Sequence, residues 1–128
     1  MTKKELIKQY RRYIDCLNQH DWSRLGDYVA DDVRRNDEAL GLAGYRKMLE
    51  GDLAAIPDLL FNIDFLVSDP PYIGARLLFD CTPKGELFGL PVNGKRVSFT
   101  ENVFYQFTGA RIKIVWSVID QAVIKAQL

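Results

Sequence analysis

The sequence is poor in the residues that most often hold metals and cofactors. It has one histidine and two cysteines among 128 residues. The two cysteines do not form a CxxC pair, so a zinc site, which takes about four such ligands at short spacing, is not expected. No GxGxxG or GxxxxGKS/T run is present, which excludes the common loops that bind nucleotide phosphates. We therefore expect neither a metal nor a cofactor.

Net charge of either sign is also absent. Lys plus Arg number 17 and Asp plus Glu number 17, so the formal net charge is zero. Proteins that bind nucleic acids through general charge carry a basic excess, so no nucleic-acid partner is expected. An apolar content of 48% without net charge also argues against a disordered chain.

Long apolar segments are missing as well. No run approaches the ~20 residues that cross a bilayer, so no membrane contact is expected. The basic N-terminus is followed by a charged amphipathic segment rather than by the apolar region of a signal peptide. We interpret Cys16 and Cys81 as reduced core residues of a cytoplasmic protein. The length fits a single domain that spans residues 1–128.

Helical patterns occupy the first half of the chain. Thr2 begins a capping box, and apolar residues then recur at the helical spacing, namely Leu6, Tyr10, Tyr13, Ile14 and Leu17. A short helix is expected after Asp21, a strand over 30–36, and a further helix over 42–55 that ends before Pro57.

Strand patterns occupy the second half. Strands are expected over 59–67, 72–82, 97–107 and 111–120, and the last two form a hairpin through 108–110. Helices followed by a run of long strands are typical of an α+β protein, in which the N-terminal helices pack on one face of a mostly antiparallel sheet.

The last strand is apolar on both of its faces. By alternation, one face carries Ile112, Ile114, Trp116 and Val118 together with Asp120, and the other carries Val115, Ser117 and Ile119. A strand of this kind is covered on both sides. The helices supply one cover, and a second subunit is a plausible source of the other, so we expect a homodimer or a larger homo-oligomer. The alternative is that the chain terminus folds back over this face.

Asp120 interrupts this apolar pattern. A carboxylate beside Trp116 would be desolvated, its pKa would rise, and it would then suit the role of a general base. Alternatively Asp120 ends the strand and caps the turn that follows, and spacing alone favours the cap by a small margin. Glu101 shares the face of Asp120 if Phe99 pairs with Asp120, whereas a shift of one residue presents Asn102 instead. The sequence leaves both registers open.

A family resemblance adds to these observations. The stretch from Gly85 to Arg96, GELFGLPVNGKR, resembles the G-E-x-x-G-x-P-x-x-G loop of SnoaL-like polyketide cyclases, also called ester cyclases. The ending, with Arg111-Ile112, Trp116 and Asp120, is similar to the K-I-x-x-x-W-x-x-x-D of that family. Further matching pieces occur in the expected order upstream, namely Asn18-Gln19-His20-Asp21, Tyr28, Asp31-Asp32-Val33, Gly44-Tyr45 and Pro57-Asp58.

The resemblance implies both a fold and a reaction. The fold is the cone-shaped α+β barrel of ketosteroid-isomerase-like proteins, which encloses an apolar cavity and oligomerises through its sheet. The reaction is a cofactor-free intramolecular aldol closure of a ring in a polyketide ester. The acid/base aspartate of the family falls on Asp120, which would remove a proton next to a carbonyl and return it to the new alkoxide. Asp120→Asn should then keep the fold and abolish turnover.

The expected substrate is a small hydrophobic, polyketide-like molecule. Candidate stacking residues are Trp116, Tyr13, Tyr45 and Phe104, and candidate polar contacts are Asn36, Glu101 and Asn102. For Arg34, Arg35 and Asn36, a place at the pocket mouth and a solvated strand edge are equal alternatives.

Two other functions fit the same fold, because folds of this kind serve many purposes. One is a binding protein that holds a small hydrophobic ligand without chemistry, and the other is a structural subunit. A cavity with Asp120 at its floor favours the enzyme, whereas Asp120 facing solvent favours the binding protein.

Overall fold

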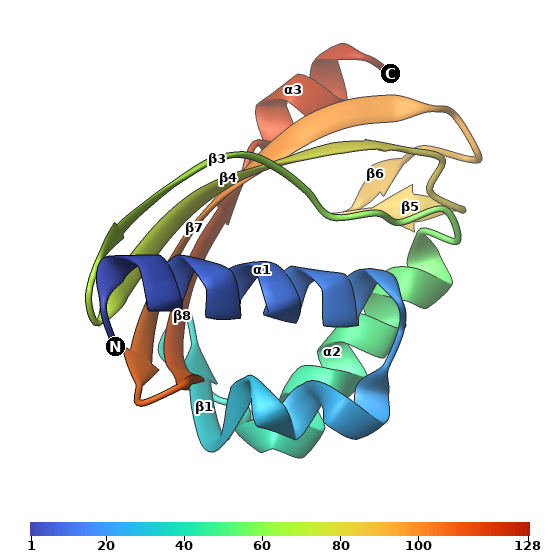
Figure 1. Ribbon diagram of the computed structural model, residues 1–128. Coiled ribbons are helices and arrows are strands. Elements are labelled where there is room, and N and C mark those ends of the chain that lie inside the picture. The colour runs from blue at the N-terminus through green and yellow to red at the C-terminus, as the bar shows by residue number, and fades with distance from the viewer.

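A curved sheet arches over two helices in the computed structural model, which describes residues 1–128 (Figure 1). The expected α+β class is confirmed. The elements in chain order are α1 (Lys3–Asn18), the 3₁₀ helix η1 (Trp22–Asp27), β1 (Val29–Arg35), β2 (Glu38–Ala39), α2 (Gly41–Ala55), β3 (Asn62–Asp69), β4 (Tyr72–Cys81), β5 (Glu86–Leu87), β6 (Leu90–Pro91), β7 (Val97–Thr108), β8 (Arg111–Ile119) and α3 (Gln121–Ala126).

The main sheet has six strands in the order β2-β1-β8-β7-β4-β3. The pairing of β1 with β8 is parallel, and the other pairs are antiparallel. The strands β5 and β6 form a separate hairpin, in the segment after residue 82 for which the sequence pattern predicts no strand. The helix α3 was also not predicted, and it lies on the outer, convex side of the sheet (Figure 1).

The helix α1 forms as its sequence predicts. The Thr2 hydroxyl accepts from the backbone N–H of Glu5, and the Glu5 carboxylate accepts from the backbone N–H of Thr2, which completes the capping box. The helix lies under the concave face of the sheet (Figure 1). The predicted apolar positions are all buried and join the main core, namely Leu6, Tyr10, Tyr13, Ile14 and Leu17.

The register of β7 with β8 decides which residues share a face. Asp120 donates its backbone N–H to the carbonyl of Thr100 over 3.0 Å, and Glu101 pairs with Ile119. Because side chains alternate between the two faces, Asn102 lies on the face of Asp120 and Glu101 lies on the concave face.

A bulge in β8 corrects one further expectation. Gln106 pairs with Ile114 but Phe107 pairs with Ile112, so β8 has one extra residue at this point. The alternation therefore reverses across Lys113, and Ile112 is fully buried rather than aligned with Trp116 on the outer face.

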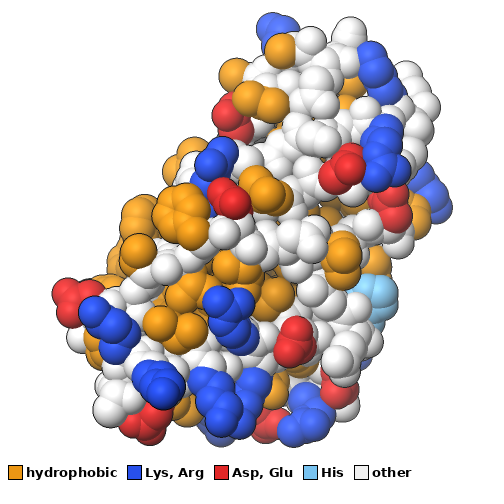
Figure 2. All heavy atoms as spheres, turned by 45° about the horizontal axis from the view of Figure 1, so that its top comes forward, with side chains coloured by type: hydrophobic (Ala, Val, Ile, Leu, Met, Phe, Trp, Pro, Cys, Tyr) orange, Lys and Arg blue, Asp and Glu red, His pale blue; other side chains and the backbone are white.

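The outer face of the sheet is unusually apolar for a solvent-facing surface. Figure 2, in which the upper side of the molecule comes forward, shows hydrophobic side chains gathered across that side. Exposed large hydrophobic residues of β3, β4, β7 and β8 include Phe65, Val67, Tyr72, Leu78, Phe104, Trp116 and Val118. None of the helices has the length and apolar character that crossing a membrane requires.

Candidate active site

A pocket of about 200 Å³ lies between the concave face of the sheet and the helices α1 and α2. Strand alternation points one set of side chains from each strand into this space, and the two helices close it from below. The lining is mostly hydrophobic, and its residues are Tyr13, Leu17, Arg35, Tyr45, Met48, Leu49, Asp52, Ala55, Ile56, Leu59, Phe61, Leu77, Phe79, Leu87, Phe88, Phe99, Glu101, Val103, Tyr105, Val115 and Ile119.

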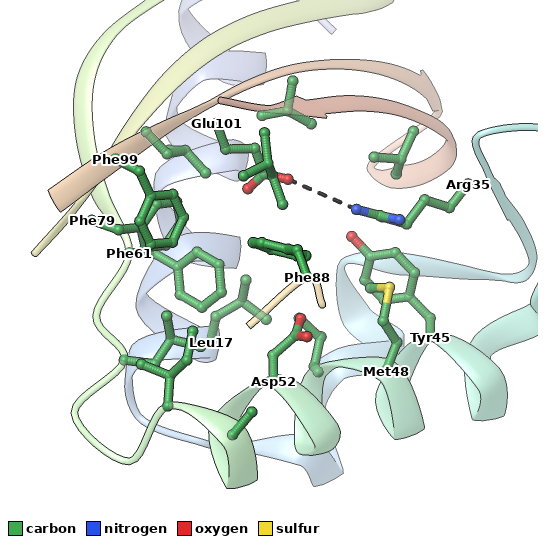
Figure 3. A pocket seen from close by; sticks show the side chains of 18 of the residues that line it. Leu17, Arg35, Tyr45, Met48, Asp52, Phe61, Phe79, Phe88, Phe99 and Glu101 are labelled. Carbon is green, nitrogen blue, oxygen red and sulfur yellow. Dashed lines mark ion pairs between the residues drawn. The ribbon is translucent and has the colours of Figure 1, made fainter. Parts of the chain in front are cut away.

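Aromatic rings form one wall of the pocket (Figure 3). Phe79 and Phe99 are paired neighbours on β4 and β7, and their rings stack with centroids 5.1 Å apart. Phe61 meets Phe79 edge to face at 5.4 Å. Phe88 follows β5 with a φ of 53° and is 43% exposed, so the hairpin presents this ring to the pocket from its solvent side. A flat, conjugated ligand would fit against such a wall.

Three charged side chains enter this apolar space from three different elements (Figure 3). Arg35 comes from the end of β1, Asp52 from α2 and Glu101 from β7. Nη2 of Arg35 lies 4.0 Å from Oε2 of Glu101, and the two side chains are only 26% and 14% exposed. The Ser117 hydroxyl donates a hydrogen bond to the Glu101 carboxylate.

The environment shifts both acids toward the neutral pH range. Burial raises the pKa of Glu101, while the hydrogen bond from Ser117 and the charge of Arg35 oppose this rise. Asp52 lies at the edge of the pocket and part of the residue reaches solvent. The protein around its carboxyl group still desolvates it and raises its pKa to about 6, with Arg35 acting in the opposite direction. The pocket therefore holds two carboxylates of raised basicity.

Three tyrosines line the pocket, and two of them, Tyr13 and Tyr45, are hydrogen-bonded to each other. The hydroxyl oxygens of Tyr13 and Tyr45 are 2.7 Å apart and share a hydrogen bond. Burial raises the pKa of Tyr45 to about 12 and that of Tyr13 well above its ordinary value. Both hydroxyls therefore remain neutral and can serve as hydrogen-bonding groups but not as bases at neutral pH.

Three of the predicted site residues, Tyr13, Tyr45 and Glu101, line this pocket. Asn36 does not line it, because it lies in the exposed turn after β1. There its amide oxygen accepts from the Ser117 backbone N–H over 2.9 Å, and its amide group donates to the Ser117 carbonyl over 3.2 Å. Asn36 thus ties β1 to the residue that donates to Glu101.

The other predicted residues lie on the opposite face of the sheet. Asn102, Phe104 and Trp116 alternate with the pocket residues and point outward. Asp120 shares their face, and its carboxylate accepts from the backbone N–H of Val123 over 3.2 Å as the N-cap of α3. This placement corrects the expected geometry, because strand alternation separates these four residues from the pocket. A catalytic role for Asp120 stays a prediction.

Sequence reasoning missed Asp52 as a pocket residue and left Arg35 between the pocket mouth and a solvated edge, although a signal for each was present. Arg35 is two residues after the fully buried Val33 and so shares its face of β1. Asp52 is seven residues after Tyr45 and three after Leu49, which is the spacing of one helix face. The charge of Asp52 made it look like a solvated residue.

Comparisons with known proteins agree with the resemblance. A family model described as SnoaL-like polyketide cyclase matches residues 7–128. A SnoaL-like polyketide cyclase from Agrobacterium tumefaciens str. C58 is 49% identical, with a TM-score of 0.95 over 99% of this chain and 98% of that chain. Two more distant structures share the fold. AclR, a proposed hydroxylase from Streptomyces galilaeus, is 22% identical with a TM-score of 0.80 over 98% of this chain and 96% of that one. TsrD from Streptomyces laurentii is 19% identical with a TM-score of 0.86 over 99% and 96%. No curated protein matches the chain.

Proposed function

Because the chain belongs to the SnoaL-like polyketide cyclase family, we propose that it closes a ring in a small, hydrophobic, polyketide-like ester without a cofactor. The reaction is an intramolecular aldol-type closure, and Glu101 is its acid/base residue. The observation that carries this proposal is the Glu101 carboxylate, which is held at 14% exposure within an aromatic pocket. A desolvated carboxylate of raised pKa is a stronger base than one in water.

The proposed reaction leaves the protein unchanged at its end. Glu101 removes a proton from the carbon next to a substrate carbonyl, which leaves an enolate. The enolate carbon attacks a second carbonyl of the same molecule, a carbon–carbon bond forms, and the electron pair of that carbonyl moves onto its oxygen. Glu101 then returns its proton to this alkoxide. The raised pKa of Asp52, about 6, makes it a second group that can exchange protons at the edge of the pocket.

Asp120 is the competing assignment. The family resemblance gives it the acid/base role, but its carboxylate caps α3 on the outer face of the sheet. We place the role on Glu101 rather than on Asp120 because Glu101 combines a place in the aromatic pocket with a desolvated carboxylate, and because it is buried more deeply than Asp52 at the pocket edge. The two assignments predict opposite results for the same pair of variants.

Proton abstraction can be measured without the natural substrate. β-Tetralone is a bicyclic aromatic ketone whose benzylic protons lie next to its carbonyl, and their exchange for deuterium in heavy water is followed by proton NMR. We expect the protein to accelerate this exchange, Glu101→Gln to abolish the acceleration, and Asp120→Asn to retain it. Exchange that survives in E101Q but is lost in D120N would return the role to Asp120.

A non-catalytic binding protein is the second candidate. The specific observation in its favour is that Asp120 is not at the floor of the cavity. On this hypothesis the protein binds β-tetralone but does not accelerate its exchange, and E101Q changes neither measurement. Acceleration by the unmodified protein contradicts it.

We also propose that the outer face of the sheet packs against a second copy of the chain. Its exposed apolar side chains, which include Phe104, Trp116 and Val118, form a continuous run on two neighbouring strands. Apolar patches of this kind mark interaction surfaces, and a self-complementary one gives a symmetric dimer. Light scattering should show a dimer or larger species, and Trp116→Glu should shift it toward the monomer. A monomeric unmodified protein would refute this arrangement.

A cytoplasmic location completes the proposal. It is supported by Cys16 and Cys81, both of which are buried and free. Free thiols are usual in reducing compartments, where disulfides rarely persist.

A further inference from the structure

Arg35 is the one cation that lines the pocket. The proposed proton transfers by Glu101 do not use it. Building on the proposed function, we propose that Arg35 binds the enolate oxygen of the substrate while Glu101 removes the neighbouring proton. The pair would then select substrates whose enolisable carbonyl can lie between these two side chains, with the rings against the phenylalanine wall.

The N–H groups of the Arg35 guanidinium make no hydrogen bond to the protein. The guanidinium lies 4.0 Å from Glu101, which is an ion-pair distance but too long for a direct hydrogen bond. No protein acceptor lies within hydrogen-bond distance of its side chain, although a guanidinium has five N–H donors in a planar fork. Figure 3 shows the side chain extending across the pocket toward Glu101. Free donors that face a largely apolar pocket suit an anionic or carbonyl oxygen.

The same contacts hold Arg35 and Glu101 in place. Arg35 pairs with Val115 in the parallel ladder of β1 and β8. The next residue, Asn36, makes two hydrogen bonds with the backbone of Ser117, whose hydroxyl donates to Glu101. Base and cation are therefore positioned by the strands before any ligand arrives, and donors fixed in advance stabilise a developing charge most effectively.

Arg35 faces one negative charge both before and after proton removal. Before the step, the positive Arg35 faces the negative Glu101. Afterwards Glu101 is neutral and the negative charge is on the enolate, so Arg35 again faces one anion. The charge moves by a few bond lengths within the reach of a single guanidinium. In a pocket of low dielectric constant this favours the enolate far more than it would in water.

Binding of an enolate mimic tests the proposal without turnover. Para-nitrophenolate supplies an aromatic ring with an anionic oxygen, and para-nitroanisole is its uncharged counterpart. E101Q is the background for these measurements, because a neutral Gln resembles the protonated Glu101 that faces the enolate. It also avoids leaving an unpaired buried carboxylate when Arg35 is replaced.

Dissociation constants are measured by absorbance titration for E101Q alone and with Arg35→Met, Arg35→Lys or Arg34→Met added. Adding R35M should weaken phenolate binding about tenfold or more and leave nitroanisole binding within about twofold. R35K should restore part of the loss. Arg34 precedes Arg35 on β1 but is exposed and donates to the Asp37 carbonyl, so R34M is the matched control and should change neither constant. Equal losses for both ligands in R35M, or no loss for phenolate, would overturn the assignment.

Turnover separates this proposal from the one on which it rests. With Glu101 present, R35M should lower the maximal rate of β-tetralone exchange about 10²- to 10³-fold with little change in KM, as expected for a group that acts mainly on the enolate. If E101Q retains exchange, the proposed function fails, whatever the phenolate measurements show. If E101Q abolishes exchange but R35M alters neither phenolate binding nor rate, only the role of Arg35 fails.

Discussion

Replacing Asp52 by Asn should stabilise the protein near neutral pH. The ordinary pKa of this carboxyl is 3.8, and partial burial raises it to about 6 in the folded protein. The folded state therefore binds the proton more tightly than the unfolded state does. The contribution of Asp52 to stability is largest below the unfolded pKa, falls as the pH rises from about 4 to 6, and is lost above that range. Asn has no charge to desolvate, so D52N avoids this loss.

The size of the effect follows from the shift. A rise of about two pKa units corresponds to about 3 kcal/mol if it is converted in full. Asp52 is exposed at the edge of the pocket, so solvent screening reduces the expected gain to about 1 kcal/mol. For a domain of this size that is a rise of about 3–5 °C in Tm. Glu101 titrates in both proteins, so most of its contribution cancels in the comparison.

The assay is urea unfolding of the unmodified protein and D52N at a series of pH values from acidic to neutral. The two stabilities should coincide in acid, where Asp52 is protonated, and diverge as the pH rises toward and above 6. Asp69→Asn, at the exposed end of β3, serves as the control for a general effect of removing negative charge. A stability difference that does not depend on pH, or one that D69N reproduces, would refute the argument from desolvation.

Two further substitutions probe the surroundings of the pocket and the cap of α3. Tyr13→Phe removes one partner of the buried hydroxyl pair with Tyr45, so it should lower the free energy of unfolding by about 1 kcal/mol in chemical denaturation. Asp120→Ala should lower the free energy of unfolding by about 1 kcal/mol because it removes the N-cap of α3. D120N should lower it less, because Asn is also a good N-cap. Equal losses of stability in the two Asp120 variants would contradict the capping role.

Sequence patterns that involve residues close together in the chain predicted much of the fold. The capping box at Thr2 and the helical spacing of α1 were visible because each depends on residues a few positions apart. The final hairpin was visible because two strand-like segments rich in apolar residues lie on either side of a short turn that contains Gly109. The helix α3 was missed, since six residues give too short a pattern to recognise.

The site was harder to predict because it depends on register and on neighbours distant in sequence. A shift of one residue between β7 and β8 decides whether Glu101 or Asn102 shares the face of Asp120, and the sequence permits either. The ion pair of Glu101 with Arg35 joins residues from strands that are not adjacent. Such a contact follows from the order of strands in the sheet, which alternation alone does not specify.

The alternation along β7 and β8 has a consequence for how this protein can be altered. Glu101, Val103 and Tyr105 contribute to the pocket, while Asn102 and Phe104, between them in the chain, belong to the outer face. Libraries of variants at the pocket-facing positions can therefore vary ligand preference while the outward-facing residues are kept constant. The reverse library would alter the outer face, on which we propose that a second copy packs, and leave the pocket lining untouched. The pocket lining and the outer face are thus encoded in one strand yet open to independent selection.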